Sequence, residues 1–260
     1  MKTTEETKYP VIKLIFRLLF GLGSLTSFVF LIYGAISWCN YIDLFKVSAI
    51  NIQGISILTE NDILQMADIG LDIHIQSLDP ATIQARLEQN PYIKAAAVSK
   101  AYPNQVNILI SERIPICYIH HKELFLVDAE GIVLPIPKQP LGSNPPVISG
   151  FDDDSLDYLP GYYVPNQKLR DIVEIVHATL ISAPELYAEI SEMHYWENGN
   201  FILYTVNSGT PIYLGNGNLP DQLSILANFQ NRLNGRRNLS DYQYLDLRWN
   251  KQIVVKERRS

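Results

Sequence analysis

The residues of this chain that could do chemistry are few and far apart. His120, His121 and Glu123 lie together, but a helical zinc site needs two histidines four residues apart, and this pair lies in a predicted hairpin. Three other histidines are isolated in the sequence: His74, His177 and His194. We therefore expect no metal ligands and no bound cofactor.

Other segments match only fragments of known sites. Asp152–Asp154 has the acidic character of a calcium loop but lacks its glycine and its closing glutamate, which favours a solvated loop. Gly215–Asn218 precedes a predicted helix without the Lys-Ser/Thr pair of a phosphate-binding loop. No serine lies in a Gly-x-Ser-x-Gly motif. The sequence predicts neither catalytic residues nor a small-molecule substrate, and so does not predict an enzyme.

The stretch from Leu18 to Trp38 is uncharged and long enough to cross a membrane. As a helix, its 21 residues would span about 31 Å, close to the roughly 30 Å hydrocarbon core of a bilayer. Four basic residues before it should keep the N-terminus in the cytoplasm: Lys2, Lys8, Lys13 and Arg17. We predict a cytoplasmic tail (1–17), one transmembrane helix (18–39) in the cytoplasmic membrane, and an exterior that is periplasmic or extracellular.

Two other interpretations of this stretch fit less well. A cleaved signal peptide has an apolar region of only about 7–15 residues, although Ala35-Ile36-Ser37 resembles a cleavage site. A lipid-modified Cys39 would follow a small residue, whereas Trp38 precedes it. Both comparisons favour an uncleaved anchor.

The composition indicates a folded, acidic exterior. The whole chain is 47% hydrophobic and 18% charged, with 15 tyrosines and no low-complexity tract, which is typical of a globular protein. After the anchor, 17 of the 21 basic residues and 25 of the 27 acidic residues remain, a net charge of −8. An acidic surface argues against a nucleic-acid partner. Cys39 and Cys117 are too few for a disulfide framework.

The first external block, residues 44–113, predicts the order strand, helix, helix, strand, strand. Ile50 and Ile52 alternate with polar residues and lead to a turn at Gly54. Helices are predicted to start at Thr59, with Asp62 three residues on, and at Asp79-Pro80. Two strands should follow from Ile93, joined by a turn near Pro103-Asn104, and the second carries alternating valine and isoleucine: Val106, Ile108 and Ile110.

The second block, residues 114–257, predicts a mixed α/β domain with a sheet. A helix from about Asn166 would bury one face and stop before Pro184: Leu169, Ile172, Val173, Val176 and Leu180. Short strands are predicted at Ile116–His120, Leu124–Val127, Gly131–Leu134, Phe201–Val206 and Pro211–Leu214. A second helix carries Ile225, Leu226, Phe229 and Leu233 and ends at Gly235. The fold class is thus α+β.

Several spaced motifs resemble the bacterial division proteins of the FtsQ/DivIB family. They are Pro91-Tyr92-Ile93-Lys94, Tyr102-Pro103-Asn104, Val106-x-Ile108-x-Ile110, Glu112-Arg113-x-Pro115, Leu126-Val127-Asp128 with Gly131, Leu214-Gly215, and Asp246-Leu247-Arg248. The resemblance implies a POTRA-like domain after the anchor, then a β-rich domain. It further implies a non-enzymatic scaffold of the division septum that binds FtsB- and FtsL-like partners and is linked to the septal synthase complex.

The chain is predicted to end in a β-hairpin that forms a sheet edge. Tyr242–Trp249 and Ile253–Lys256 are the strands, with a tight turn at Asn250-Lys251, so that Leu247 should face Val254 and Arg248 should face Ile253. An unpaired edge can accept a strand from another chain. The family resemblance implies that this edge docks the FtsB-like partner, and we expect the contact residues to be Arg248, Trp249, Gln252, Ile253, Val254, Val255 and Lys256.

Other interpretations stay open at this stage. Ile253–Val255 could simply complete the sheet, with Trp249 in the core. Glu112-Arg113 could face a partner or form an ion pair at the domain junction. The POTRA-like domain has sheet edges of its own and could instead serve protein translocation or outer-membrane assembly as a chaperone, although no strands for a barrel follow. The sequence determines neither the envelope type nor the oligomeric state.

Overall fold

The computed structural model describes residues 10–70, 73–142, 144–151, 157–196, 199–233, 235–249 and 252–258. The predicted acidic loop Asp152–Asp154 and the predicted turn Asn250-Lys251 lie outside these residues. The chain folds as two compact units. One comprises Met1–Asn51, Asp68–Ile83 and Val98–Ile108, and the other comprises Ile52–Ala67, Gln84–Ala97 and Leu109–Ser260.

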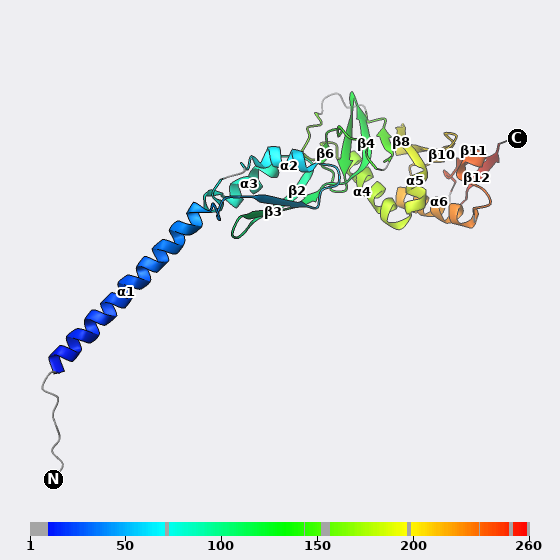
Figure 1. Cartoon of the computed structure of the whole chain (residues 1–260). Coiled ribbons are helices and arrows are strands. Elements are labelled where there is room, and N and C mark those ends of the chain that lie inside the picture. Colours follow the sequence, from blue (N-terminus) through cyan, green and yellow to red (C-terminus); the bar gives the residue numbers. More distant parts are fainter. Residues whose placement is uncertain are drawn as a thin grey trace, which may run out of the picture. The chain divides into compact units, whose positions relative to one another are not determined.

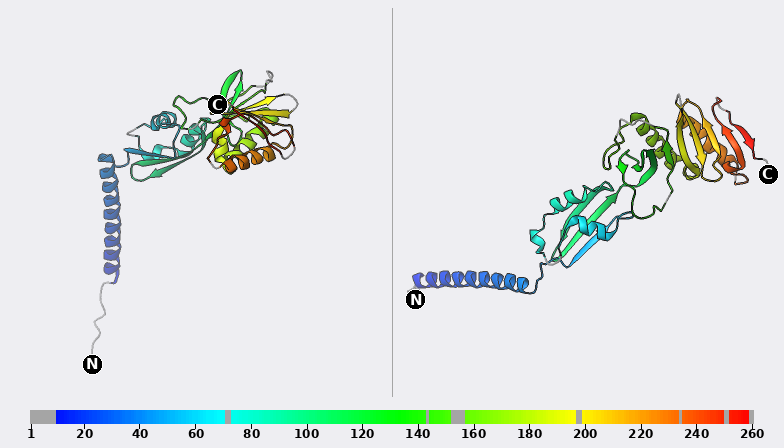
Figure 2. Two further views of the ribbon diagram at one scale, coloured as in Figure 1. Left: turned by 90° about the vertical axis from the view of Figure 1, so that its right-hand side faces the viewer. Right: turned by 90° about the horizontal axis from the view of Figure 1, so that it is seen from above.

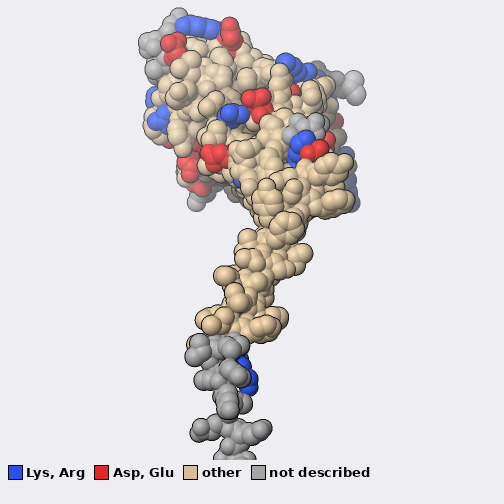
Figure 3. All heavy atoms as spheres, turned by 60° about the vertical axis from the view of Figure 1, so that its left-hand side comes forward, with Lys and Arg blue, Asp and Glu red and all other residues tan. Residues whose placement is uncertain are grey.

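Helix α1 (Pro10–Tyr41) contains the predicted anchor and extends beyond it on both sides (Figure 1). Within Lys13–Tyr41 an 18-residue window reaches a mean hydropathy of 2.0, and no other helix of the described chain is long and apolar enough to cross a membrane. Figure 3 shows this helix without coloured charges along most of its described length. Between Lys13 and Tyr41 its side chains are exposed, apart from the partly buried Cys39, so its apolar surface is free to face lipid.

The first external block contains a three-stranded sheet and two helices in the predicted order. The elements are β1 (Ala49–Gln53), α2 (Glu60–Ala67), α3 (Pro80–Leu87), β2 (Ile93–Ala101) and β3 (Gln105–Glu112). The sheet order is β1-β3-β2, so β3 is central. As its alternation predicts, β3 buries one face: Val106, Ile108 and Ile110. The sequence interpretation of this block as strand, helix, helix, strand, strand is confirmed.

Local sequence signals explain where these elements begin and turn. Thr59 Oγ1 accepts the Asp62 N–H while the Asp62 carboxylate accepts the Thr59 N–H, which is the capping box predicted for α2. The Asp79 carboxylate accepts the Ala81 N–H at the start of α3. Gly54 has φ +85°, and a Cβ atom there would lie 2.0 Å from the Ile110 carbonyl oxygen, so the turn after β1 requires glycine.

The described residues after β3 form one nine-stranded sheet with three α-helices. The strands are β4 (Pro115–His121), β5 (Glu123–Asp128), β6 (Val133–Leu134), β7 (Val147–Ser149), β8 (Ile190–Trp196), β9 (Asn200–Thr205), β10 (Pro211–Leu214), β11 (Tyr242–Asp246) and β12 (Val254–Glu257). The helices are α4 (Gln167–Ser182), α5 (Pro184–Glu189) and α6 (Leu219–Leu233). The strand order is β12-β11-β10-β9-β8-β7-β4-β5-β6. The predicted α+β class with a β-rich second part is confirmed.

The three helices pack on one face of this sheet, as Figures 1 and 2 show. The Asn166 side chain caps α4 by accepting the Leu169 N–H. The predicted apolar face of α4 is buried except for Leu180, which is partly buried against the same core. Sequence reasoning missed β7 and β8, the two strands that join β4 to β9 in the middle of the sheet.

Candidate functional site

The C-terminal strand β12 lies at one end of the nine-stranded sheet, with only β11 as its neighbour among the described strands. The two strands are antiparallel, and the paired residues are Asp246 with Val254, Leu245 with Val255, Tyr244 with Lys256, and Tyr242 with Glu257. A β-bulge lies between Tyr242 and Tyr244. The sheet therefore ends in a strand whose outer side pairs with no other described strand.

The register of this hairpin differs from the prediction by one residue. Val254 pairs with Asp246 rather than with Leu247, and the strands stop short of Arg248 and Ile253. The cause lies in the neighbouring strand, because the Leu247 N–H donates to the Tyr213 carbonyl of β10 at 2.9 Å. The connection between the strands is therefore longer than a two-residue turn.

The direction of the backbone groups in β12 follows from these bonds. The Leu247 N–H faces β10, and the backbone groups of successive strand residues point to opposite sides. The N–H and C=O groups of Asp246 and Tyr244 therefore face β12, and these two residues form the hydrogen-bonded pairs with Val254 and Lys256. The N–H and C=O groups of Val255, which lies between those partners, then point away from β11. The Arg258 N–H donates to the Asp241 carbonyl, which by the same alternation directs Glu257 outward as well. Val255 and Glu257 thus present four main-chain groups to the open edge.

The side chains at this edge are mostly accessible. Trp249 is 63% exposed, Val254 43% and Val255 38%, while Gln252 and Lys256 are also exposed. Trp249 is therefore not part of the core. Ile253 differs from the other predicted contact residues, because it is partly buried and packs against the core of the sheet. The structure brings all seven predicted residues into one hairpin but leaves Ile253 little surface for a partner.

A charged pair stiffens the start of the hairpin. The Arg248 guanidinium donates to both carboxylate oxygens of Asp246 at 2.9 and 2.6 Å, and the Arg248 N–H donates to the same carboxylate. Hydrogen bonding from Arg248 lowers the pKa of the Asp246 carboxyl below its usual value, although burial acts in the opposite direction. The guanidinium also lies 5.3 Å from the centre of the Tyr213 ring. Arg248 is thus held in place by Asp246 at the end of β11.

Sequence reasoning missed two further features of the hairpin. Arg258 ties the end of β12 to the sheet by donating to the carbonyls of Tyr242 and Ser208. A cavity of about 520 Å³ lies between Gly215–Asn218, the start of α6 and the residues Leu247, Arg248, Trp249 and Gln252. The Gln222 Oε1 atom on its wall is buried and has no hydrogen-bond partner in the described part of the chain. The turn Gly215–Asn218 was the sequence signal for this cavity, but it carried no indication of what it faces.

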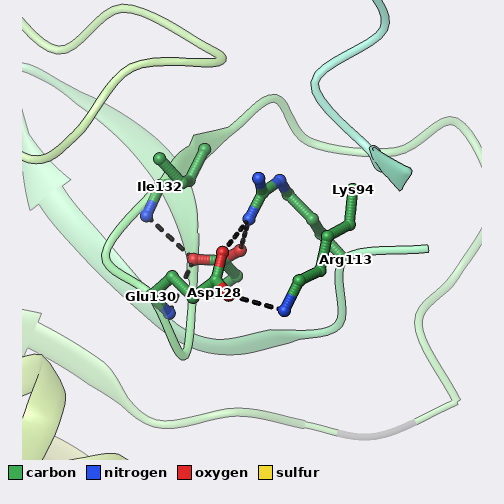
Figure 4. Close-up of polar contacts among 5 residues, drawn as sticks. All are labelled: Lys94, Arg113, Asp128, Glu130 and Ile132. Carbon is green, nitrogen blue, oxygen red and sulfur yellow. Dashed lines mark hydrogen bonds and ion pairs between the residues drawn. The ribbon is translucent and has the colours of Figure 1, made fainter. Parts of the chain in front are cut away.

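A second polar cluster joins β2 and the end of β3 to the hairpin after β5 (Figure 4). Arg113 Nη1 donates to Asp128 Oδ2 at 2.6 Å and to Glu130 Oε2 at 2.7 Å. Lys94 Nζ donates to the other Glu130 oxygen at 2.5 Å. Asp128 also accepts the N–H groups of Glu130 and Ile132. Hydrogen bonds from Lys94 and Arg113 lower the pKa of Glu130 below its usual value.

Glu112 and Tyr92 complete this joint. Glu112 does not pair with Arg113. Its carboxylate accepts the N–H groups of Ser56–Leu58 instead. The Tyr92 hydroxyl donates to the Pro135 carbonyl at 2.5 Å, and the ring packs in a small buried cluster with Leu126, Ile132 and Leu134. Burial raises the pKa of Tyr92 to about 12. These contacts give Arg113 and Tyr92 a structural role at the joint.

One cluster of the β domain contains a serine, a histidine and a carboxylate. His194, predicted to be isolated, has Nδ1 2.7 Å from the Ser149 hydroxyl, and that hydroxyl donates to Glu192 at 2.5 Å. In a hydrolase triad the imidazole lies between the serine and the carboxylate. Here the imidazole and the carboxylate both contact the same hydroxyl, so the serine is not activated in that way. No group of three or more His, Cys, Asp or Glu that could hold a metal is found in the described part of the chain.

Comparisons with known proteins connect this geometry to a family. Residues 45–113 match the family described as "POTRA domain, FtsQ-type", and residues 117–248 match "Cell division protein FtsQ/DivIB, C-terminal". The cell division protein FtsQ of Geobacter sp. (strain M21) is 25% identical over 214 residues, which are 82% of this chain and 77% of the relative. That of Syntrophotalea carbinolica is 27% identical over 216 residues, covering 82% and 74%.

A relative with the other family name matches a shorter region. The cell division protein DivIB of Bacillus subtilis is 30% identical over 129 residues, which are 48% of this chain and 49% of the relative. The C-terminal match spans half of the chain, and together with the POTRA match it accounts for nearly all residues from the end of α1 to the start of the terminal hairpin turn. The chain belongs to the FtsQ/DivIB family of bacterial cell division proteins.

Proposed function

We propose that this chain is a non-enzymatic scaffold of the bacterial divisome that captures a partner outside the membrane by strand addition to β12. The observation that carries the proposal is the open edge at the C-terminal end of the nine-stranded sheet. Its outward N–H and C=O groups at Val255 and Glu257 can pair with an added strand, while Val254 and Trp249 offer exposed apolar surface beside it.

The edge has the elements of a specific interface. Four main-chain hydrogen bonds, at about 0.5–1.5 kcal/mol each, would contribute roughly 2–6 kcal/mol. Trp249 belongs to a residue type enriched in interface hot spots, and its 63% exposure leaves a large ring to be covered. The added strand would belong to an FtsB-like partner bound to an FtsL-like one, and through them the scaffold would couple assembly of the division site to septal peptidoglycan synthesis.

The proposed placement follows from the anchor and the domain order. The cytoplasmic tail comprises residues 1–17, the transmembrane helix 18–39, the POTRA-like domain 44–113 and the β domain 114–257. Basic residues before the apolar stretch favour a cytoplasmic N-terminus, so both folded domains would lie outside the cytoplasmic membrane. The protein would then accumulate at the division septum.

The proposal is tested by following the protein in growing cells of its own organism. A fluorescent protein fused to the N-terminus should form a band at mid-cell, and depletion of the chain should yield filaments of undivided cells. An even membrane signal with normal cell lengths after depletion would refute the division role. It would favour the alternative of a POTRA-type chaperone, for which the outer strands β1 and β2 of the three-stranded sheet offer edges.

A further inference from the structure

A groove of about 590 Å³ runs between α4 and α6, on the helical side of the β domain and away from the β12 edge. Residues from one side of each helix line it, and α5 contributes Pro184–Leu186 at one end. On α6 the lining residues recur every three to four positions, as expected for one face of a helix: Pro220, Leu223, Ser224, Ala227, Asn228, Gln230 and Asn231. The groove therefore follows α6 for about three turns, or roughly 16 Å.

The floor of the groove is apolar and firmly packed. Leu223, Leu186 and Thr179 are buried, and Ile175 and Ala227 are partly buried against the same core. Protein interiors are normally close-packed, so a channel of this size between two helices is space that neither helix fills. Small side chains on both walls would let another backbone approach closely.

Three polar side chains in the groove donate to carbonyls of their own helices. The Thr179 hydroxyl donates to the Ile175 carbonyl at 2.8 Å, and the Ser182 hydroxyl donates to the Ala178 carbonyl at 2.7 Å. On the opposite wall, the Asn228 amide donates to the Ser224 carbonyl at 2.9 Å. Covering these three groups with apolar side chains would leave their donors paired, which lowers the desolvation cost of an apolar occupant.

The charge of the groove has one sign. Among the described residues, the charged ones that line it are Glu174 on α4 and Glu185 on α5, and none is Lys or Arg. Both carboxylates belong to exposed residues, so a partner with basic residues beside its apolar face would meet complementary charge.

We propose that this groove binds an amphipathic helix of a partner protein, with an apolar stripe in the groove and Lys or Arg on its flanks. The groove length suits anchors at positions i, i+3 or i+4, i+7 and i+11, the spacing by which helices bind hydrophobic grooves. This surface is independent of β12, and both could be occupied at once.

Photo-crosslinking in cells of the native organism tests the proposal on the full chain. Benzoylphenylalanine replaces Asn228, which is exposed and lines the groove, or Arg232, which is exposed and does not line it. We expect an adduct from position 228 at least tenfold stronger than from position 232. Mass spectrometry should place the crosslink in a partner segment with apolar residues at helical spacing and neighbouring Lys or Arg.

Two variants at exposed positions separate docking from loss of folding. Ala178→Trp, on α4, fills the groove, and the double change Glu174→Lys with Glu185→Lys reverses its charge. Each should weaken the adduct at least tenfold while the circular dichroism spectrum stays unchanged. Val255→Pro should leave the adduct intact, which separates this site from the β12 edge. Absence of an adduct at position 228, an acidic or non-helical crosslinked segment, or an adduct insensitive to charge reversal would overturn the proposal.

Discussion

Replacing Val255 with proline is the most direct test of strand addition at β12. The N–H of Val255 points away from β11, so the change removes a donor at the open edge without removing a bond of the hairpin. The proline ring also occupies the space through which an added strand would approach. We therefore expect the folded state to persist while partner binding weakens.

The expected magnitude follows from the number of outward groups. Val255 supplies two of the four main-chain groups at the edge. Proline removes the N–H, and its ring keeps an added strand away from the Val255 carbonyl, so both hydrogen bonds are lost. At about 0.5–1.5 kcal/mol each, this weakens binding by roughly 1–3 kcal/mol. The Kd for the external segment of the FtsB-like partner should therefore rise about 5- to 150-fold. The assay is isothermal titration calorimetry with the full chain in nanodiscs.

Two neighbouring changes serve as controls. Val255→Thr keeps the amide and the β-branched shape and should bind like the wild type. Val254→Pro instead removes an amide that faces β11, so it should lower the stability of the hairpin itself and shift the unfolding transition. A Kd for Val255→Pro equal to that of Val255→Thr, in a protein of unchanged circular dichroism, would refute strand addition. Equal loss of stability in Val255→Pro and Val254→Pro would refute the outward direction of the Val255 N–H and the inward direction of the Val254 N–H.

Three further predictions concern the joint and the start of the hairpin. Arg113→Ala leaves the buried Asp128 carboxylate without its cation and should lower the free energy of urea unfolding by about 3 kcal/mol. Lys94→Ala, which removes an exposed ion pair, should lower it by less than about 1 kcal/mol. Equal losses would contradict a buried role for Arg113. Tyr92→Phe removes a hydrogen bond to a backbone carbonyl and should cost about 1 kcal/mol in the same assay. Burial raises the pKa of both Tyr92 and Tyr187 to about 12, so ultraviolet titration should lose one of these two late-ionising tyrosines. The Asp246 pKa is lowered in the folded state, so its stabilisation is present above the unfolded value of about 3.9 and is lost as pH falls through the folded pKa. Between pH 5 and pH 3 the unfolding free energy of the wild type should therefore drop further than that of Asp246→Asn, and parallel curves would show that the contact with Arg248 contributes nothing.

The sequence by itself predicted the parts of this protein that depend on near neighbours. The uncharged stretch from Leu18 to Trp38 is sufficient to predict the anchor, because burial in lipid depends on length and charge within one helix. The alternation in β3 predicted which of its side chains are buried. The caps at Thr59 and Asp79 predicted two helix starts, because a cap involves residues two or three positions apart.

The tertiary structure decided what depends on distant segments. Val147–Ser149 is too short to show a pattern, yet it forms β7 because β4 and β8 supply hydrogen-bond partners on both sides. The partner of Arg113 could not be predicted, since Asp128 reaches it through the turn of a later hairpin. The predicted hairpin register was wrong by one residue because the Tyr213 carbonyl in β10 fixes Leu247. Periodicity records which face a residue occupies along one strand, whereas pairing and register are fixed by backbone groups of other strands, which no local pattern contains.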